Sequence, residues 1–164
     1  MGERRIINID AVGLEDAGNG KCFRGKKARL GSGIGSTGLG CTLVVLAPGE
    51  KAFPMHRHHI LDELFYIVAG EGEVRLDGET LPVRVGDVIA NPAGKEAHQI
   101  VNSSNAELKY LAISTMGEAD IVEYPDSGKL ALAAGIKGSD FAKATIKGVG
   151  RLQPTGYFDG EPET

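Results

Sequence analysis

All four histidines of the sequence lie between positions 56 and 98, and two of them are separated by a single residue. In an extended strand, the side chains of residues i and i+2 point to the same face. The imidazoles of His56 and His58 are therefore expected to stand side by side, as a chelating pair does. Arg57 and His59 have the opposite parity and are expected to point away from that face.

A carboxylate and a third imidazole extend this pair. Glu63 begins the run Glu63–Val68, which is otherwise rich in apolar residues, and a carboxylate there is costly to bury unless a cation holds it. His98 follows the turn sequence Pro92–Gly94 and begins a second apolar stretch. Three imidazoles and one carboxylate suit Mn, Fe, Ni, Zn or Co. Taken singly, these residues also fit an exposed histidine pair, a solvated strand end and a core histidine.

The elements that must position these residues are predicted to be β-strands. Short apolar runs alternate with turn sequences at intervals of roughly ten residues, the spacing of a sandwich or barrel. Helical periodicity is missing from this region, and the 24 glycines suit a fold with many tight turns. Asp77-Gly78 predicts a hairpin turn. The predicted strands are Thr42–Ala47, Glu63–Ala69, Glu73–Leu76, Asp87–Ala90, His98–Val101, Leu108–Ser114 and Asp120–Glu123.

The length of 164 residues is that of one domain. Within it we expect an N-terminal arm and Gly-rich loop over residues 1–40, a barrel over residues 41–123 and a C-terminal strap over residues 124–164. The first part is expected to be irregular apart from a short strand at Ile6–Ile9, and it includes a basic segment, Lys21–Leu30. The strap is expected to hold a short helix near Ser139–Lys143 and to be anchored at Tyr157–Phe158.

Composition argues against several classes of protein. Lys and Arg total 18 against 22 Asp and Glu, a net charge of −4, which does not favour nucleic-acid binding. No apolar run approaches the ~18 residues of a membrane span, and the N-terminus lacks the apolar segment of a secretory signal. The two cysteines, Cys22 and Cys41, fit neither a disulfide scaffold nor a metal motif. We therefore expect a cytoplasmic protein whose partner is a small molecule.

Two ordered patterns in the middle of the chain resemble the two motifs of the cupin superfamily. The first motif runs glycine, HxH, glutamate, glycine, and it is found here as Gly49, His56, His58, Glu63 and Gly70. The second runs glycine, PxG, histidine, asparagine, and it is found as Gly86, Pro92, Gly94, His98 and Asn102. Each motif is one residue longer than the usual pattern, ahead of His56 in the first and ahead of His98 in the second.

This resemblance implies an all-β fold, a cupin-type jelly-roll β-barrel (double-stranded β-helix). It also implies a divalent transition metal (Zn, Mn, Fe, Ni or Co) inside the barrel, and a homodimer. The ligands would be His56, His58, Glu63 and His98, while Asn102 is expected to cap a turn. The flanks Tyr124–Asp126 and Tyr157–Glu161 are similar to those of small bacterial single-cupin proteins, some of which are labelled sugar phosphate isomerases.

Three functions stay open at this point. The first is a metal-dependent isomerase or lyase that acts on a sugar, a sugar phosphate or a similar polyoxygenated metabolite. The second is an iron-dependent oxygenase, and the third is a binding cupin without turnover. Isomerisation needs a group that moves a proton, and no residue is assigned to that role. A phosphate would need a basic clamp, but strand parity does not place the barrel cations at its mouth. The candidates for the proton-moving group are Tyr66, Tyr110, Gln99 and Lys51, and the barrel cations are Arg84, Lys95 and Lys109.

Overall fold

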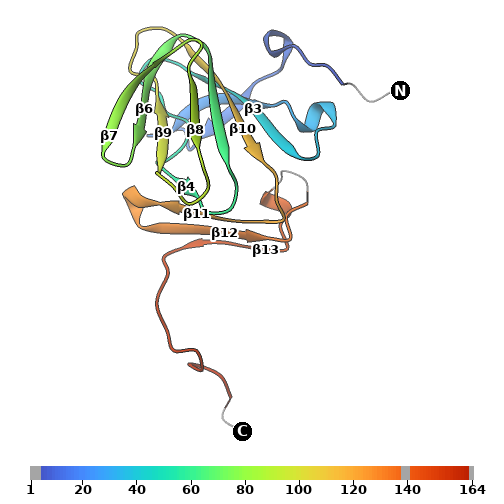
Figure 1. Ribbon diagram of the computed structural model, residues 1–164, viewed down its shortest axis with the longest axis vertical. Helices are drawn as coiled ribbons and strands as arrows, with labels where there is room; N and C mark the ends of the chain where they lie inside the picture. The colour runs from blue at the N-terminus through green and yellow to red at the C-terminus, as the bar shows by residue number, and fades with distance from the viewer. Residues whose placement is uncertain (1–4, 138–140, 163–164) are drawn as a thin grey trace.

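The chain folds into a barrel of antiparallel strands with a smaller sheet beneath it and an extended C-terminal segment that runs away from both (Figure 1). This computed structural model describes residues 5–137 and 141–162. The predicted all-β fold is confirmed. In the described part of the chain the helical structure is limited to short 3-10 turns, and no helix there is long and apolar enough to cross a membrane.

The barrel consists of two sheets that enclose one apolar core. The six-stranded sheet has the order β1-β2-β3-β10-β5-β8, and the three-stranded sheet has the order β7-β6-β9. The strands of the first are Glu15–Gly18 (β1), Arg24–Arg29 (β2), Leu39–Leu46 (β3), Leu108–Thr115 (β10), Glu63–Ala69 (β5) and Val88–Asn91 (β8). Those of the second are Glu79–Arg84 (β7), Glu71–Leu76 (β6) and His98–Val101 (β9). Inward-facing side chains such as Leu46, Ile67 and Leu108 are fully buried between them.

A four-stranded sheet of order β13-β12-β11-β4 lies below the barrel (Figure 1). Its strands are Arg57–His58 (β4), Ala119–Tyr124 (β11), Lys129–Ala134 (β12) and Ile146–Gly150 (β13). The short strand β4 contains the second histidine of the HxH pair. Its pairing with β11 therefore connects the predicted metal site to this lower sheet.

The structure contains all seven predicted strands and the hairpin at Asp77-Gly78, where β6 turns directly into β7. The motif glycines Gly70 and Gly86 have positive φ, as their turn positions require. A side chain at Gly70 would also collide with the carbonyl oxygen of Glu107, 2.2 Å from an ideal Cβ.

The expectation of an irregular N-terminal part needs correction, because β1 and β2 add two strands to the main sheet. The segment of β2 reads as a basic loop, yet its pairing with β1 and β3 makes it a strand. The short strand expected at Ile6–Ile9 is wrong. The chain there leads into a 3-10 turn at Ile9–Ala11, capped by the Asn8 side chain, which accepts a hydrogen bond from the amide of Asp10.

The C-terminal strap also differs from its prediction. Of the helix expected near Ser139–Lys143, residues 138–140 lie outside the described residues, and Phe141–Lys143 form a 3-10 turn. The anchor predicted at the end of the strap is wrong: Tyr157 is 91% and Phe158 77% exposed, and their rings pack on each other. Ordering residues after β13 against the barrel costs ~1–2 kcal/mol of backbone entropy each. Two aromatic contacts do not offset that cost without a strand partner.

Candidate metal centre

Backbone pairing between distant segments brings the histidines together. His56 and His98 form an isolated bridge, in which the amide of His98 donates to the carbonyl of His56 at 2.8 Å and the reverse bond measures 3.1 Å. His58 belongs to β4 and pairs with Val122 of β11. Glu63 is the first residue of β5 and pairs with Asn91, the last residue of β8. The site is therefore assembled from both barrel sheets and the lower sheet.

The three imidazoles converge on a single carboxylate oxygen. Glu63 Oε2 lies 3.0 Å from His98 Nε2, 3.7 Å from His58 Nε2 and 3.9 Å from His56 Nε2. His56, Glu63 and His98 form a group whose ligand atoms all lie within 4.8 Å of one another. His98 is 2% exposed, so the second-motif histidine points into the barrel and not into bulk solvent. The structure thus places all four predicted residues side by side.

The residues of opposite parity point away from this cluster, as the sequence predicts. Arg57 forms ion pairs with Asp77 and Glu123 at 3.2 and 3.1 Å. His59 is directed at Glu123 as well, with its Nε2 3.2 Å from the carboxylate. Asn102 is fully buried and holds a turn, because its amide donates to two backbone carbonyls and its oxygen accepts from Ser104.

Hydrogen bonds on the outer side of two imidazoles decide which nitrogen faces the cluster. His56 Nδ1 lies 2.8 Å from the carbonyl oxygen of Pro54, which can only accept, so Nδ1 carries the proton. His58 Nδ1 donates in the same way to the carboxylate of Asp120. In the neutral form of each ring, Nε2 then presents a lone pair toward Glu63.

This arrangement fits a bound cation. The Nε2 lone pairs of His56 and His58 each lie within 4 Å of the same carboxylate oxygen, and a positive charge between these acceptors would stabilise the arrangement. The Nδ1 of His98 is buried without a hydrogen-bond partner among the described residues. Imidazole nitrogens with one carboxylate are a donor set typical of divalent transition metals.

The electrostatics of the cluster differ from residue to residue. Burial, followed by the neighbouring His98, lowers the pKa of His56 to about 4. Burial also acts to lower the pKa of His58, but the hydrogen bond to Asp120 and the charge of Glu63 raise that pKa overall. Burial acts to raise the pKa of Glu63, whereas its hydrogen bond with His98 and the nearby histidines lower it overall. Glu63 therefore stays ionised, and His58 takes up a proton more readily than His56 does.

Asp120, which the sequence reasoning did not single out, is the buried partner behind His58. Its side chain is fully buried, and Oδ1 accepts from the amides of Ile121 and Ile60 at 2.9 and 3.3 Å. A signal was present, because Asp120 begins an apolar strand just as Glu63 does. Its contact with His58, 62 residues earlier, arises only from the pairing of β4 with β11.

A cavity of about 300 Å³ opens beside the cluster, large enough for a small metabolite. His56 and Glu63 lie on its wall together with aromatic and small polar residues. The other residues that line it are Lys27, Arg29, Ser32, Gly40, Cys41, Thr42, Val44, Phe53, Phe65, Tyr110, Ala112, Ser114 and Phe141. Phe141, from the segment expected to form the C-terminal strap, is therefore part of this wall.

Of the four candidates for a proton-moving group, Tyr110 lines the cavity. Burial and the charge of Glu63 raise its pKa, so its hydroxyl stays protonated and can donate. Tyr66 is exposed on the other face of β5, Gln99 is bonded to Phe53 and Arg75, and Lys51 lies over the ring of Phe23.

Comparison with known proteins identifies the barrel. Residues 42–114 match the cupin domain family. A cupin-superfamily structure from Silicibacter pomeroyi, described as a sugar phosphate isomerase, superimposes with a TM-score of 0.75 at 25% identity and covers 97% of this chain and 96% of its own. The cupin barrel predicted from the two motifs is thus confirmed.

Two curated relatives match shorter stretches. An oxalate-binding protein of Thermotoga maritima is 37% identical over 68 residues, which is 42% of this chain and 54% of that protein. A 5-nitrosalicylic acid 1,2-dioxygenase of a Bradyrhizobium species is 35% identical over 92 residues, 56% of this chain and 38% of that protein. The chain spans about half the length, or less, of the curated relatives it matches.

Proposed function

Because residues 42–114 are a cupin domain, we propose that this protein binds a divalent transition metal through His56, His58, Glu63 and His98 and acts as an isomerase on a small polyoxygenated metabolite such as a sugar or sugar phosphate. The observation that carries the proposal is the inward arrangement of acceptors: the lone pairs of two imidazoles face one carboxylate oxygen beside a cavity of about 300 Å³. The Silicibacter pomeroyi protein, similar over nearly the whole chain, supports the choice of reaction.

The residues around the cluster have distinct roles in this proposal. A metal at the site would act as a Lewis acid that polarises a carbonyl of the substrate. Pro54 and Asp120 hold two imidazoles in the ligating tautomer. Thr42 and Ser114 offer hydroxyl groups to a polar substrate, and the protonated Tyr110 can donate a hydrogen bond to a substrate oxygen.

The direct test is elemental analysis of the purified protein and of the variant Glu63→Gln. We expect about one transition-metal ion per chain in the native protein and much less in the variant. The loaded protein is then incubated with aldoses, ketoses and their phosphates, and interconversion is followed by NMR. Metal-free protein that cannot be loaded would refute the metal site, and a loaded protein that interconverts none of these sugars would refute the isomerase.

A second function, an iron-dependent oxygenase, is favoured by the aromatic part of the cavity. Phe53, Phe65 and Phe141 line it, and one relative is a dioxygenase of an aromatic acid. Oxygen uptake by iron-loaded protein in the presence of salicylate would support this alternative over the isomerase. Binding of small acids without turnover by either assay would instead support a binding cupin.

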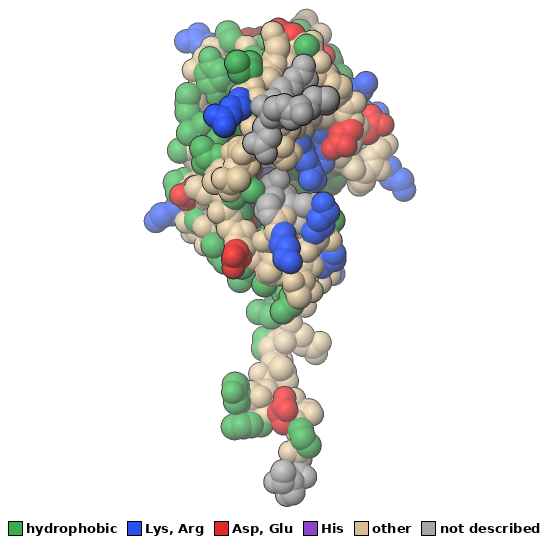
Figure 2. Space-filling view, turned by 90° about the vertical axis from the view of Figure 1, so that its right-hand side faces the viewer, with side chains coloured by type: hydrophobic (Ala, Val, Ile, Leu, Met, Phe, Trp, Pro, Cys, Tyr) green, Lys and Arg blue, Asp and Glu red, His purple; other side chains and the backbone are tan. Residues whose placement is uncertain are grey.

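We also propose that the protein acts as a homodimer in the cytoplasm. The edge strand β13 is exposed along its whole length, and the segment after it carries exposed Leu152, Tyr157 and Phe158. Figure 2 shows hydrophobic side chains along this tail. Exposed strand edges and apolar side chains of this kind are commonly covered by a second chain. The free thiols of Cys22 and Cys41 fit a reducing compartment.

A further inference from the structure

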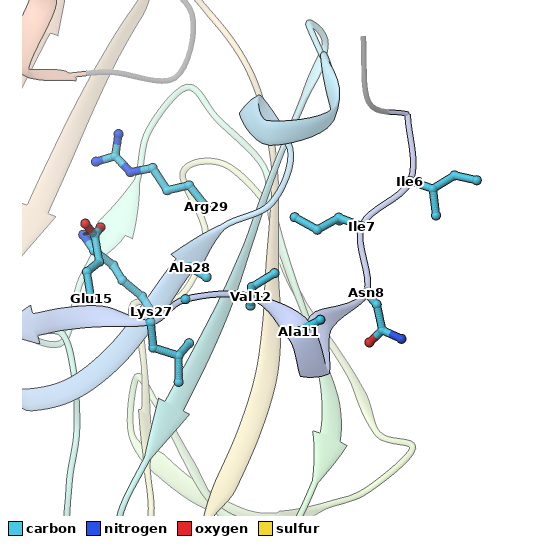
Figure 3. Close-up of a pocket in the computed structure, with 11 residues that line it drawn as sticks. Ile6, Ile7, Asn8, Ala11, Val12, Glu15, Lys27, Ala28 and Arg29 are labelled. Atoms are coloured by element: carbon cyan, nitrogen blue, oxygen red, sulfur yellow. Dashed lines mark ion pairs between the residues drawn. The ribbon is translucent and has the colours of Figure 1, made fainter. Parts of the chain in front are cut away.

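Two cations from the N-terminal part of the chain lie on the wall of the cavity. In the register of β2 with β3, Lys27 pairs with Val44 and Arg29 pairs with Thr42. All four residues line the cavity of the metal centre. Figure 3 draws a second pocket, beside the N-terminal segment, that Lys27 and Arg29 also line; the Arg29 side chain extends there from β2 on the side away from Ile7 and Val12. The strand that reads as a basic loop therefore supplies the cavity with positive charge.

Lys27 and Arg29 differ in whether their charge is already paired with a carboxylate. Lys27 forms an ion pair with Glu15, its cross-strand neighbour on β1, at 3.7 Å. Arg29 has neither an ion pair nor a side-chain hydrogen bond within the described residues, and it is exposed. Several Lys and Arg side chains gather on one face of the molecule (Figure 2). Among the described residues that line the cavity, Glu63 is the one carboxylate, and it belongs to the cluster of histidines.

The position of Arg29 sets the distance over which it would act. The strands β3 and β10 separate β2 from β5, which carries Glu63. Three strand spacings amount to about 14 Å along the sheet, and the long Arg29 side chain shortens the remaining gap. A substrate with several carbon atoms can therefore reach from the cluster to the guanidinium. A guanidinium binds phosphate or carboxylate with two parallel hydrogen bonds.

We propose that the substrate is an anion and that Arg29, supported by Lys27, binds its phosphate or carboxylate group while the opposite end lies at the metal centre. This inference rests on the proposed function and narrows it to acidic substrates. The three barrel cations that strand parity did not place at the mouth are not involved: Lys109 pairs with Glu107, and Arg84 and Lys95 lie outside the cavity lining.

The test compares three sugars with the same carbon skeleton: glucose, glucuronate and glucose 6-phosphate. Their binding to the native protein, Arg29→Gln and Lys26→Gln is measured by isothermal titration calorimetry. Lys26 is the matched control, since it is exposed on the same strand and does not line this cavity. We expect at least one anionic sugar to bind tenfold or more tightly than glucose to the native protein. Arg29→Gln should remove that preference, and Lys26→Gln should retain it within twofold.

The two anionic sugars show which acidic group the site binds. A preference for glucose 6-phosphate identifies a phosphate site, and a preference for glucuronate identifies a carboxylate site. Equal binding of all three sugars to the native protein, or an unchanged preference in Arg29→Gln, would overturn the inference. Metal content is measured on each sample, and the titrations are repeated on metal-free protein. Loss of the metal site and loss of the anion site are therefore seen separately.

Discussion

Replacing Asp120 with asparagine tests whether His58 is a metal ligand. The change is nearly isosteric, and the amide oxygen can still accept from the amides of Ile60 and Ile121, as Oδ1 does now. The amide NH₂ then faces His58 Nδ1. The opposite orientation would set NH₂ against two backbone N–H groups and leave these part-buried donors unpaired, at a cost of about 1 kcal/mol each. The structure therefore fixes the orientation of the new side chain.

In that orientation the new carboxamide would donate to His58 Nδ1, so the neutral ring must carry its proton on Nε2, the nitrogen that faces Glu63. A protonated Nε2 cannot bind a metal. Loss of such a supporting carboxylate typically costs about 10–100-fold in metal affinity, which is about 1.4–2.8 kcal/mol at 1.4 kcal/mol per factor of ten. We expect Asp120→Asn to weaken Zn²⁺ binding by this amount at pH 7.5.

The affinity is measured by competition between the protein and a chromogenic chelator, with folding checked by circular dichroism. Glu123→Gln is the matched control, because Glu123 is on the same strand and contacts His59, whose ring faces away from the cluster. Its Zn²⁺ affinity should stay within twofold of the native value. If Asp120→Asn folds and binds Zn²⁺ as tightly as the native protein does, His58 is not a ligand whose tautomer Asp120 controls.

Three further predictions concern pH, stability and assembly. Burial acts to lower the pKa of His58, but Asp120 raises it, so a proton on His58 displaces the metal as pH falls. A metal concentration a hundredfold above Kd, worth about 2.7 kcal/mol, should therefore stabilise the protein at pH 7.5 and much less at pH 5. An equal Tm shift on adding chelator at both pH values would contradict a histidine site. Asn102→Ala removes four buried or part-buried hydrogen bonds and should lower the free energy of urea unfolding by about 3 kcal/mol. The control Asn105→Ala, at an exposed position, should change this free energy by less than about 0.5 kcal/mol. Equal losses in the two variants would rule out the turn-capping role of Asn102. Light scattering should give a dimer for the native chain and a monomer for a chain truncated after Gly150, and a native mass of 17.2 kDa would refute the dimer.

The local features of the site follow from the sequence alone. Period-two parity was enough to separate His56 and His58 from Arg57 and His59, because alternation along a strand is a property of the backbone. The same alternation and the turn residues located the central strands and the Asp77-Gly78 hairpin. The motif order then indicated the barrel, although the metal-ligand assignment itself stays a prediction.

The distant residues that surround the cluster were set by the pairing of strands in three dimensions. Asp120 lies behind His58 because β4 pairs with β11, and Arg29 reaches the cavity because β2 pairs with β3. Neither pairing leaves a periodic signal in its own segment: β4 has two residues, and β2 is mostly basic. Strand register is a relation between two segments, specified where both bury a face together. The roles of Asp120 in the tautomer of His58 and of Arg29 in the charge of the cavity could therefore be recognised only from the pairing of the strands.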